Sequence, residues 1–185
     1  MKKLFTLLAL TISFSMNAQL VSVTEGSNNG QRLSRSNAAN HGDIGNNAVD
    51  LSYSNTSVST GATGASSVAL GENTTASGVF STALGVGTLA NGQGSTALGS
   101  GTVAGGFYAT ATGFFTTASG DYSTAMGFGV QEEGLTNSGT PYYKNEASGG
   151  YSVVIGSRNK SEGLQSVSIG RDNLSSGTSS TAIGE

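Results

Sequence analysis

The residues that could do chemistry are few in this sequence of 185 residues. It contains one histidine, His41, and no cysteine, so a single chain can build neither a histidine-dependent catalytic triad nor a histidine or cysteine metal cluster. Glu132 and Glu133 have no repeated acidic partner, and the aspartate-bearing calcium nonapeptide of some solenoids is absent. General acid–base catalysis has no visible residues, so we expect no enzyme, no metal and no cofactor.

Binding chemistry has one distinctive candidate, an insertion within 128–149. It holds the only proline and two adjacent tyrosines, in the run Pro141, Tyr142, Tyr143 and Lys144. Tyrosines give large contact areas at low entropic cost, and insertions in repeat proteins often lie on the binding face. We predict a binding loop at these four residues. A purely structural loop is the alternative.

The insertion interrupts a strict repeat whose period is fourteen positions. Glycines mark its phase at Gly71, Gly85, Gly99, Gly113 and Gly127, and again at Gly156, Gly170 and Gly184. Each unit reads Ser-x-Ala-φ-Gly, where φ is usually large and apolar, and its second half usually reads Thr-x-Ala-x-Gly. Two short period-two segments, each closed by glycine, predict two strands and two turns in every unit. The glycine positions are therefore predicted to be the repeat turns.

The predicted fold is all-β, a parallel β-solenoid with one repeat unit per rung. A helix is disfavoured because a glycine in its interior costs about 1 kcal/mol. Collagen requires glycine at every third position and abundant proline, and the sequence has neither. Eight rungs spaced about 4.8 Å apart predict a rod roughly 40 Å long.

Side-chain alternation assigns the two faces of the first strand. In Thr82-Ala83-Leu84 the middle side chain points away from its neighbours, and this middle position is almost always small. The interior is therefore predicted to accept little more than a methyl group. The large apolar residues then form an outward ladder at Leu70, Leu84, Leu98, Met126, Ile155, Ile169 and Ile183.

The ladder predicts a partner for this face. Monomers rarely expose apolar patches of this size, and burying each side chain contributes about 1.5–3 kcal/mol. We expect a homo-oligomer packed around the ladder, because packing the ladders together contributes on the order of ten kcal/mol per chain. The alternatives are a ladder exposed on a monomer and a ladder covered by another segment.

Composition and charge exclude one class of partner. Glycine accounts for 29 residues, charged residues for 10%, and the net charge is −3. No lysine or arginine occurs between Arg35 and Lys144. Nucleic-acid binding needs clustered cations to neutralise phosphates, so we expect no nucleic-acid partner.

The N-terminus has the pattern of a secretory signal. Lys2 and Lys3 precede a short apolar run from Leu4 to Ile12, and small or polar residues follow as far as Ala18. The run is shorter than the about 20 residues of a membrane span. We predict a signal peptide at 1–18, a non-repetitive leader at 19–60, repeats at 61–185 and no transmembrane anchor in this chain.

The repeat resembles the head repeats of trimeric autotransporter adhesins. The resemblance covers about 61–185 and rests on Ser-Val-Ala-Leu-Gly at 67–71, its recurrence once in every unit and the Ala-Ser-Gly between copies. It implies a left-handed parallel β-roll, a homotrimer, and attachment to host or other surfaces through a protein or glycan receptor. The expected location is the cell surface, in association with the outer membrane, or the secreted fraction.

Two other functions fit parts of the pattern. A passive spacer would carry a further domain. An ice-binding solenoid would use the threonine rank that includes Thr82, Thr96 and Thr110, although alternation places this rank beside the ladder.

Several aromatic residues also share one phase of the repeat, and they form either a contact stripe or a cap on the coil edge. These four are Phe80, Tyr108, Tyr122 and Tyr151.

Overall fold

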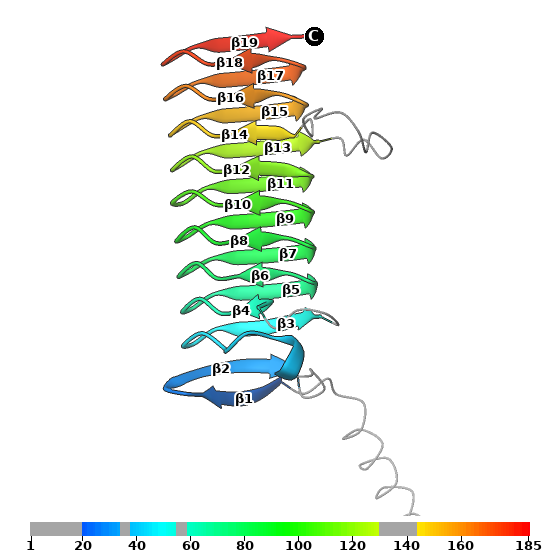
Figure 1. Cartoon of the computed structure of the whole chain (residues 1–185), viewed down its shortest axis with the longest axis vertical. Coiled ribbons are helices and arrows are strands. Elements are labelled where there is room, and N and C mark those ends of the chain that lie inside the picture. Colours follow the sequence, from blue (N-terminus) through cyan, green and yellow to red (C-terminus); the bar gives the residue numbers. More distant parts are fainter. Residues whose placement is uncertain (1–19, 34–37, 55–58, 130–143) are drawn as a thin grey trace, which may run out of the picture.

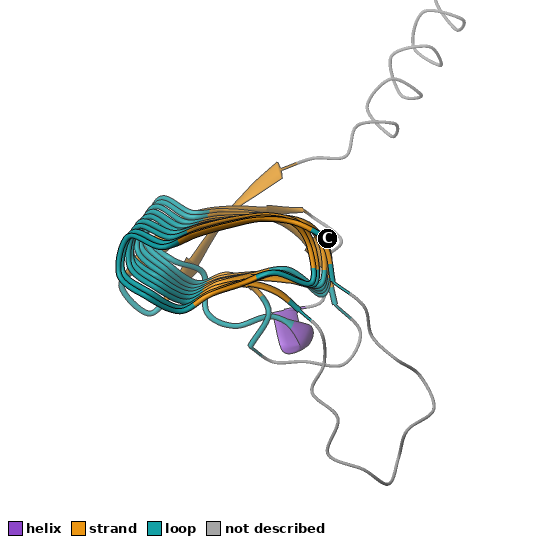
Figure 2. Cartoon of the chain, turned by 90° about the horizontal axis from the view of Figure 1, so that it is seen from above, coloured by secondary structure: helices purple, strands orange, loops and turns teal. Residues whose placement is uncertain are grey.

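Two short strands per repeat return the chain to the same place one rung higher, and the turns of chain stack along one axis (Figure 1). This computed structural model describes residues 20–33, 38–54, 59–129 and 144–185. The longer strands join an 11-stranded sheet and the shorter strands an 8-stranded sheet. Seen along the axis, the coils superimpose as a flattened ring (Figure 2). The predicted all-β parallel solenoid is confirmed, whereas its left hand and trimeric state stay predictions.

The strand bounds follow the repeat. The larger sheet contains β1 (Leu20–Glu25), β2 (Asn28–Leu33), β3 (Val49–Tyr53), β5 (Val68–Glu72), β7 (Thr82–Val86), β9 (Thr96–Ser100), β11 (Thr110–Phe114), β13 (Thr124–Phe128), β15 (Val153–Ser157), β17 (Val167–Arg171) and β19 (Thr181–Gly184). The smaller sheet contains β4 (Gly61–Ala62), β6 (Thr75–Ala76), β8 (Leu89–Ala90), β10 (Val103–Ala104), β12 (Thr116–Ala118), β14 (Asn145–Ala147), β16 (Lys160–Ser161) and β18 (Leu174–Ser175). A short 3-10 helix, η1 (Ala38–Asn40), lies between β2 and β3.

The register keeps each residue above its equivalent in the coil before. Leu70 pairs with Leu84, one full repeat further along the chain. Across the insertion the same register continues, because Thr124 pairs with Val153 and β12 pairs with β14. The coils on either side of the insertion therefore keep one common register.

The glycines of the repeat allow neighbouring coils to approach closely. The glycines predicted to be repeat turns lie instead inside the longer strands, as Gly85 does in β7. Gly85 has φ +130°, and a Cβ atom there would lie 1.9 Å from the carbonyl oxygen of Gly99. In the other glycine phase, a Cβ atom on Gly78 would lie 2.1 Å from the carbonyl oxygen of Gly92. Any side chain at these positions would separate the rungs, which explains why the sequence keeps both glycine phases.

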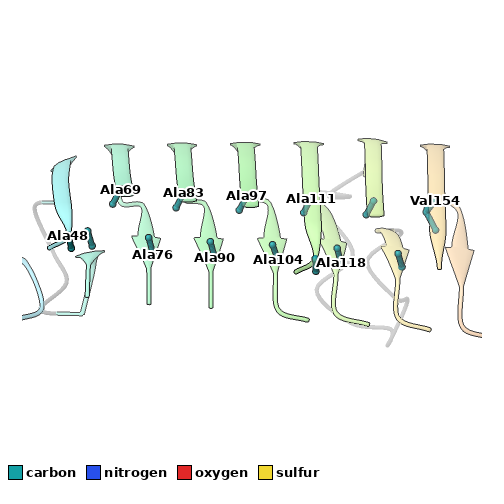
Figure 3. Close-up of a cluster of buried hydrophobic side chains, with 14 of the residues drawn as sticks. Ala48, Ala69, Ala76, Ala83, Ala90, Ala97, Ala104, Ala111, Ala118 and Val154 are labelled. Atoms are coloured by element: carbon teal, nitrogen blue, oxygen red, sulfur yellow. The ribbon is translucent and has the colours of Figure 1, made fainter. Parts of the chain in front are cut away.

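Alanine fills the centre of the coil from both sheets (Figure 3). The longer strands contribute Ala69, Ala83, Ala97, Ala111 and Ala125, and the shorter strands contribute Ala76, Ala90, Ala104, Ala118 and Ala147, all fully buried. The predicted small-residue interior is therefore confirmed between the sheets. At the corners the methyl-sized estimate is wrong, because Ser67, Thr88 and Asn159 are also buried. Ser67 fits there because its Oγ donates to the carbonyl oxygen of Gly64 at 2.7 Å.

Part of the leader joins the stack and adds a ninth parallel rung to the eight expected. β1 and β2 form an antiparallel hairpin, β2 pairs in parallel with β3, and β3 pairs with β5. In this register Arg32 lies beside Asp50, and Asp50 lies beside Ala69. Two charged residues therefore occupy the column that alanines fill in the repeats.

Candidate functional site

The outer face of the longer-strand sheet carries the predicted apolar column, which we call the ladder. In β7, Leu84 is 39% exposed whereas the adjacent Ala83 is fully buried. Leu84 lies in register between Leu70 and Leu98. The remaining ladder residues, Met126, Ile155, Ile169 and Ile183, are exposed or half-buried. A single chain thus presents an apolar stripe along the rod, and its role in oligomer formation stays a prediction.

The structure extends the ladder and also shows its interruption. Leu51 pairs in register with Leu70 and begins the column. Sequence reasoning missed Leu51 because the interval from Leu51 to Leu70 is longer than the period of the repeat. Its only signal is the apolar–polar alternation around Asp50. In the middle of the ladder, Thr112 lies between Leu98 and Met126 and replaces an apolar side chain.

Two further outward columns border the ladder on the same face. On one side lie Val68, Thr82, Thr96, Thr110, Thr124, Val153 and Val167, most of them half-buried. On the other side, Phe114 and Phe128 stack with ring centroids 5.0 Å apart and 15° between ring planes. The threonine rank considered for ice binding is therefore part of the same surface as the ladder.

A second group of rings lies at the opposite narrow edge of the coil, where a shorter strand turns into the next longer strand. Tyr108 and Tyr122 stack with centroids 5.7 Å apart and 14° between planes, and Tyr122 and Tyr151 stack at 5.0 Å and 7°. Phe107 meets Tyr108 edge-on at 5.4 Å. All four side chains are exposed. We call Tyr108, Tyr122 and Tyr151 the tyrosine row.

The predicted binding loop falls mostly outside the described residues. Pro141, Tyr142 and Tyr143 are not described, and Lys144 is exposed. Lys144 and Gly129, at the two ends of the insertion, belong to the turn from a longer to a shorter strand. Both described ends of the insertion therefore lie at the narrow edge opposite the tyrosine row.

His41 belongs to a buried charged cluster that sequence reasoning missed. Its Nδ1 lies 3.1 Å from Oδ2 of Asp50, and Nε of Arg32 lies 3.3 Å from the same oxygen. Arg32 also pairs with Glu25 at 2.8 Å, and the Ser52 hydroxyl donates to Oδ1 of Asp50 at 2.6 Å. We call these five residues the cap cluster. It closes the first coil, and no group in the described ranges is arranged to hold a metal ion.

Most of the other described charged side chains lie in the coils after the insertion. Nζ of Lys160 lies 2.6 Å from Oε1 of Glu162, and Lys160 pairs in register with Glu146. The hydrogen bond to Glu162 raises the pKa of Lys160, with a smaller contribution from the negative charge of Glu146. Arg158 and Asp172 form a further ion pair. These exposed pairs contribute little to stability at neutral pH.

The two-strand coil, the buried alanines and the glycine-tight stacking define a repeat protein of the parallel β-roll class. The family model of the YadA head domain repeat (2 copies) matches residues 62–88, 76–102, 90–113, 104–129 and 147–173. These matches together cover 62–129 and 147–173, just over half of the chain. The chain therefore belongs to the YadA head domain repeat family, and the resemblance to trimeric autotransporter adhesin heads is confirmed.

No curated protein matches the chain. Among the described residues, the structure has no helix of the length and apolar character needed to cross a membrane.

Proposed function

We propose that this chain is exported and forms, as a homotrimer, the rod-shaped head of a cell-surface adhesin that attaches cells to host or other surfaces. The ladder is the observation that carries the proposal. Its large apolar side chains lie on the outer face, while alanines already fill the space between the two sheets. Only another chain or segment can bury them, and the family match favours other copies of the same chain.

The energetics support assembly through this face. Burying a side chain such as Leu84 contributes about 1.5–3 kcal/mol, and the ladder repeats this contact along the rod. In the two bordering columns, Val68 on one side and Val86, Phe114 and Phe128 on the other add exposed apolar surface. A closed ring of three copies joins two different parts of the surface at each contact, so a broad apolar face is what such a ring requires.

The mass in solution of residues 19–185 tests the assembly. We expect a trimer for the wild type and a monomer for Leu84→Ser combined with Leu98→Ser. Leu89→Ser combined with Val103→Ser is the matched control, because these two residues lie on the shorter-strand sheet. A monomeric wild type, or a double ladder variant that keeps the wild-type mass, would contradict the proposal.

Attachment and export need separate measurements. Export predicts that the secreted chain begins at Gln19, which N-terminal sequencing checks.

Attachment predicts that beads coated with the wild-type chain adhere to host-cell or abiotic surfaces more than beads coated with the monomeric ladder variant. The binding-loop proposal predicts weaker adhesion for Tyr142→Ser combined with Tyr143→Ser, with the trimer mass unchanged.

A further inference from the structure

The tyrosine row occupies a place in the coil where the fold does not require a ring. Its members have φ values of 51°, 57° and 55°, in the left-handed region where bulky residues are uncommon. Four other coils place small or flexible residues at the same phase, with the same sign of φ: Ser66, Gly94, Gln165 and Ser179. Phe80 also carries a ring at this phase, but Gly94 in the next coil separates it from the row. Folding alone therefore does not explain why three exposed, stacked rings occupy an unfavourable backbone conformation. Their mutual stacking offsets part of the conformational free-energy cost.

The geometry of the row fixes what it offers to a partner. Because the rings stack face to face, each ring covers the face of its neighbour and leaves its edge open. Within the described part of the chain, no hydrogen bond involves the phenol groups of Tyr108, Tyr122 and Tyr151. The row thus presents one phenol hydroxyl per rung, on rings whose centroids lie 5.0–5.7 Å apart along the rod.

The charge around the row excludes anionic ligands. Asp121, the residue before Tyr122, accepts a hydrogen bond from the backbone N–H of Phe107 at 2.9 Å. No cation occurs in the sequence between Arg35 and Lys144, Lys144 lies at the opposite edge of the coil, and Lys160, in the coil after Tyr151, is paired with Glu162. A nucleic acid or sulfated glycan requires clustered cations, which this surface lacks.

We propose that the tyrosine row binds a neutral, extended polysaccharide running parallel to the rod axis. The rung spacing is close to the length of one sugar ring, so successive sugars meet successive phenol groups through hydroxyl–hydroxyl hydrogen bonds and ring edges. A protein partner fits less well, because protein interfaces bury individual rings in pockets and stacked rings cannot enter them separately. The inference rests on the proposed attachment function and names a ligand class for it.

Retention on insoluble polysaccharides tests the row, with residues 19–185 as the protein. The probes are β-1,4-linked glucan and β-1,4-linked N-acetylglucosamine polymers, with heparin as the anionic probe and deglycosylated extracellular protein as the protein probe. The triple variant Tyr108→Ser, Tyr122→Ser and Tyr151→Ser should fold, because serine already occupies this corner at Ser66 and Ser179. Leu164→Ser combined with Gln165→Ser is the matched control at the same edge.

We expect the wild type to bind at least one neutral polymer and the triple serine variant to bind at least about tenfold more weakly, because repeated contacts are lost together. The corresponding triple phenylalanine variant keeps the stacked rings and should also bind more weakly, since it lacks the hydroxyls. The control should bind like the wild type.

Three results would overturn the inference: no binding of the wild type to either neutral polymer, equal binding of the triple serine variant, or retention only on heparin or protein. The mass and bead adhesion of the same proteins separate the two proposals. If the wild type adheres and its triple serine variant adheres and binds equally well, only the polysaccharide inference fails. If the wild type does not adhere at all, the proposed attachment function fails.

Discussion

At the scale of single residues, the stack depends on which glycines face the next coil. Gly85 and Gly87 are two positions apart in one coil and both have positive φ, +130° and +60°. A Cβ atom at Gly85 would collide with the backbone of Gly99, whereas one at Gly87 would meet nothing within 4 Å. Substitutions at the two sites can therefore be compared to separate the cost of backbone strain from the cost of a collision between coils.

We predict that Gly87→Ala costs about 1–2 kcal/mol, the strain of a left-handed backbone alone. Gly85→Ala should cost on the order of 4 kcal/mol or more, because it also forces two rungs apart. Thermal unfolding followed by circular dichroism compares the two midpoints. Equal midpoints for the two variants would show that backbone approach between coils is not what the repeat glycines protect.

The cap cluster gives a second test at single residues. Arg32→Met removes the guanidinium beside the fully buried Asp50 and leaves only His41 and Ser52 against its carboxylate, and breaking a buried ion pair costs about 3–5 kcal/mol. Repeat proteins can open locally, so we expect faster hydrogen exchange in β1, β2 and β3 and unchanged exchange from β9 onward. Val21→Ser, on the exposed face of the hairpin, is the control, and exchange that rises uniformly along the rod would contradict local capping.

At the scale of the element, the corner between longer and shorter strands changes type at the insertion. Before it, buried threonines occupy the corner, and Oγ1 of Thr116 has no hydrogen-bond partner within the described residues. After it, asparagines replace them. Nδ2 of Asn159 donates to the carbonyl oxygens of Ile155 at 3.0 Å and Gly170 at 2.7 Å. Its Oδ1 accepts from the backbone N–H of Asn173 at 3.0 Å.

We predict that Asn159→Ala destabilises the coils after the insertion by about 2–3 kcal/mol, since it leaves buried backbone groups unpaired. Asn159→Thr should cost less, because threonine forms the same corner in the coils before the insertion. Hydrogen exchange in β15, β17 and β19 measures the local effect for each variant. If the threonine variant loses as much as the alanine variant, the two corner types are not interchangeable.

The strands and faces of the repeats could be predicted because a fixed glycine phase and strict alternation leave one arrangement in which Ala83 lies inside and Leu84 outside. The leader could not be placed in this way. Asp50 occupies an alanine position but is charged, and its burial depends on partners from other segments, Arg32 on the preceding strand β2 and His41. Long-range pairing of this kind carries no period, so no pattern in one sequence reveals it.

The candidate surfaces were predictable to a different degree. The ladder followed from side-chain alternation, and the shared phase of Tyr108, Tyr122 and Tyr151 was visible as a spacing. Their stacking and left-handed backbone were not, because phase alone does not fix how a turn directs its side chains. Leu51, like Asp50, was missed because the leader does not follow the period of the repeat.

At the scale of the whole molecule, the proposed assembly should be sensitive to the one polar position of the ladder within the repeats, Thr112. Thr112 lies between Leu98 and Met126, where every other rung of the repeats has a large apolar side chain. In a monomer, a leucine at this position would only add exposed apolar surface. In an oligomer packed around the ladder, it would be buried once in every chain.

We therefore predict that Thr112→Leu stabilises the oligomer by about 1.5–3 kcal/mol per chain, the contribution of one buried leucine. The unfolding midpoint should rise, and dissociation on dilution should shift to lower protein concentration. Thr117→Leu, on the shorter-strand sheet of the same coil, is the control and should leave dissociation unchanged. If Thr112→Leu lowers the midpoint or promotes aggregation without changing dissociation, the ladder faces solvent and the proposed assembly through this face is wrong.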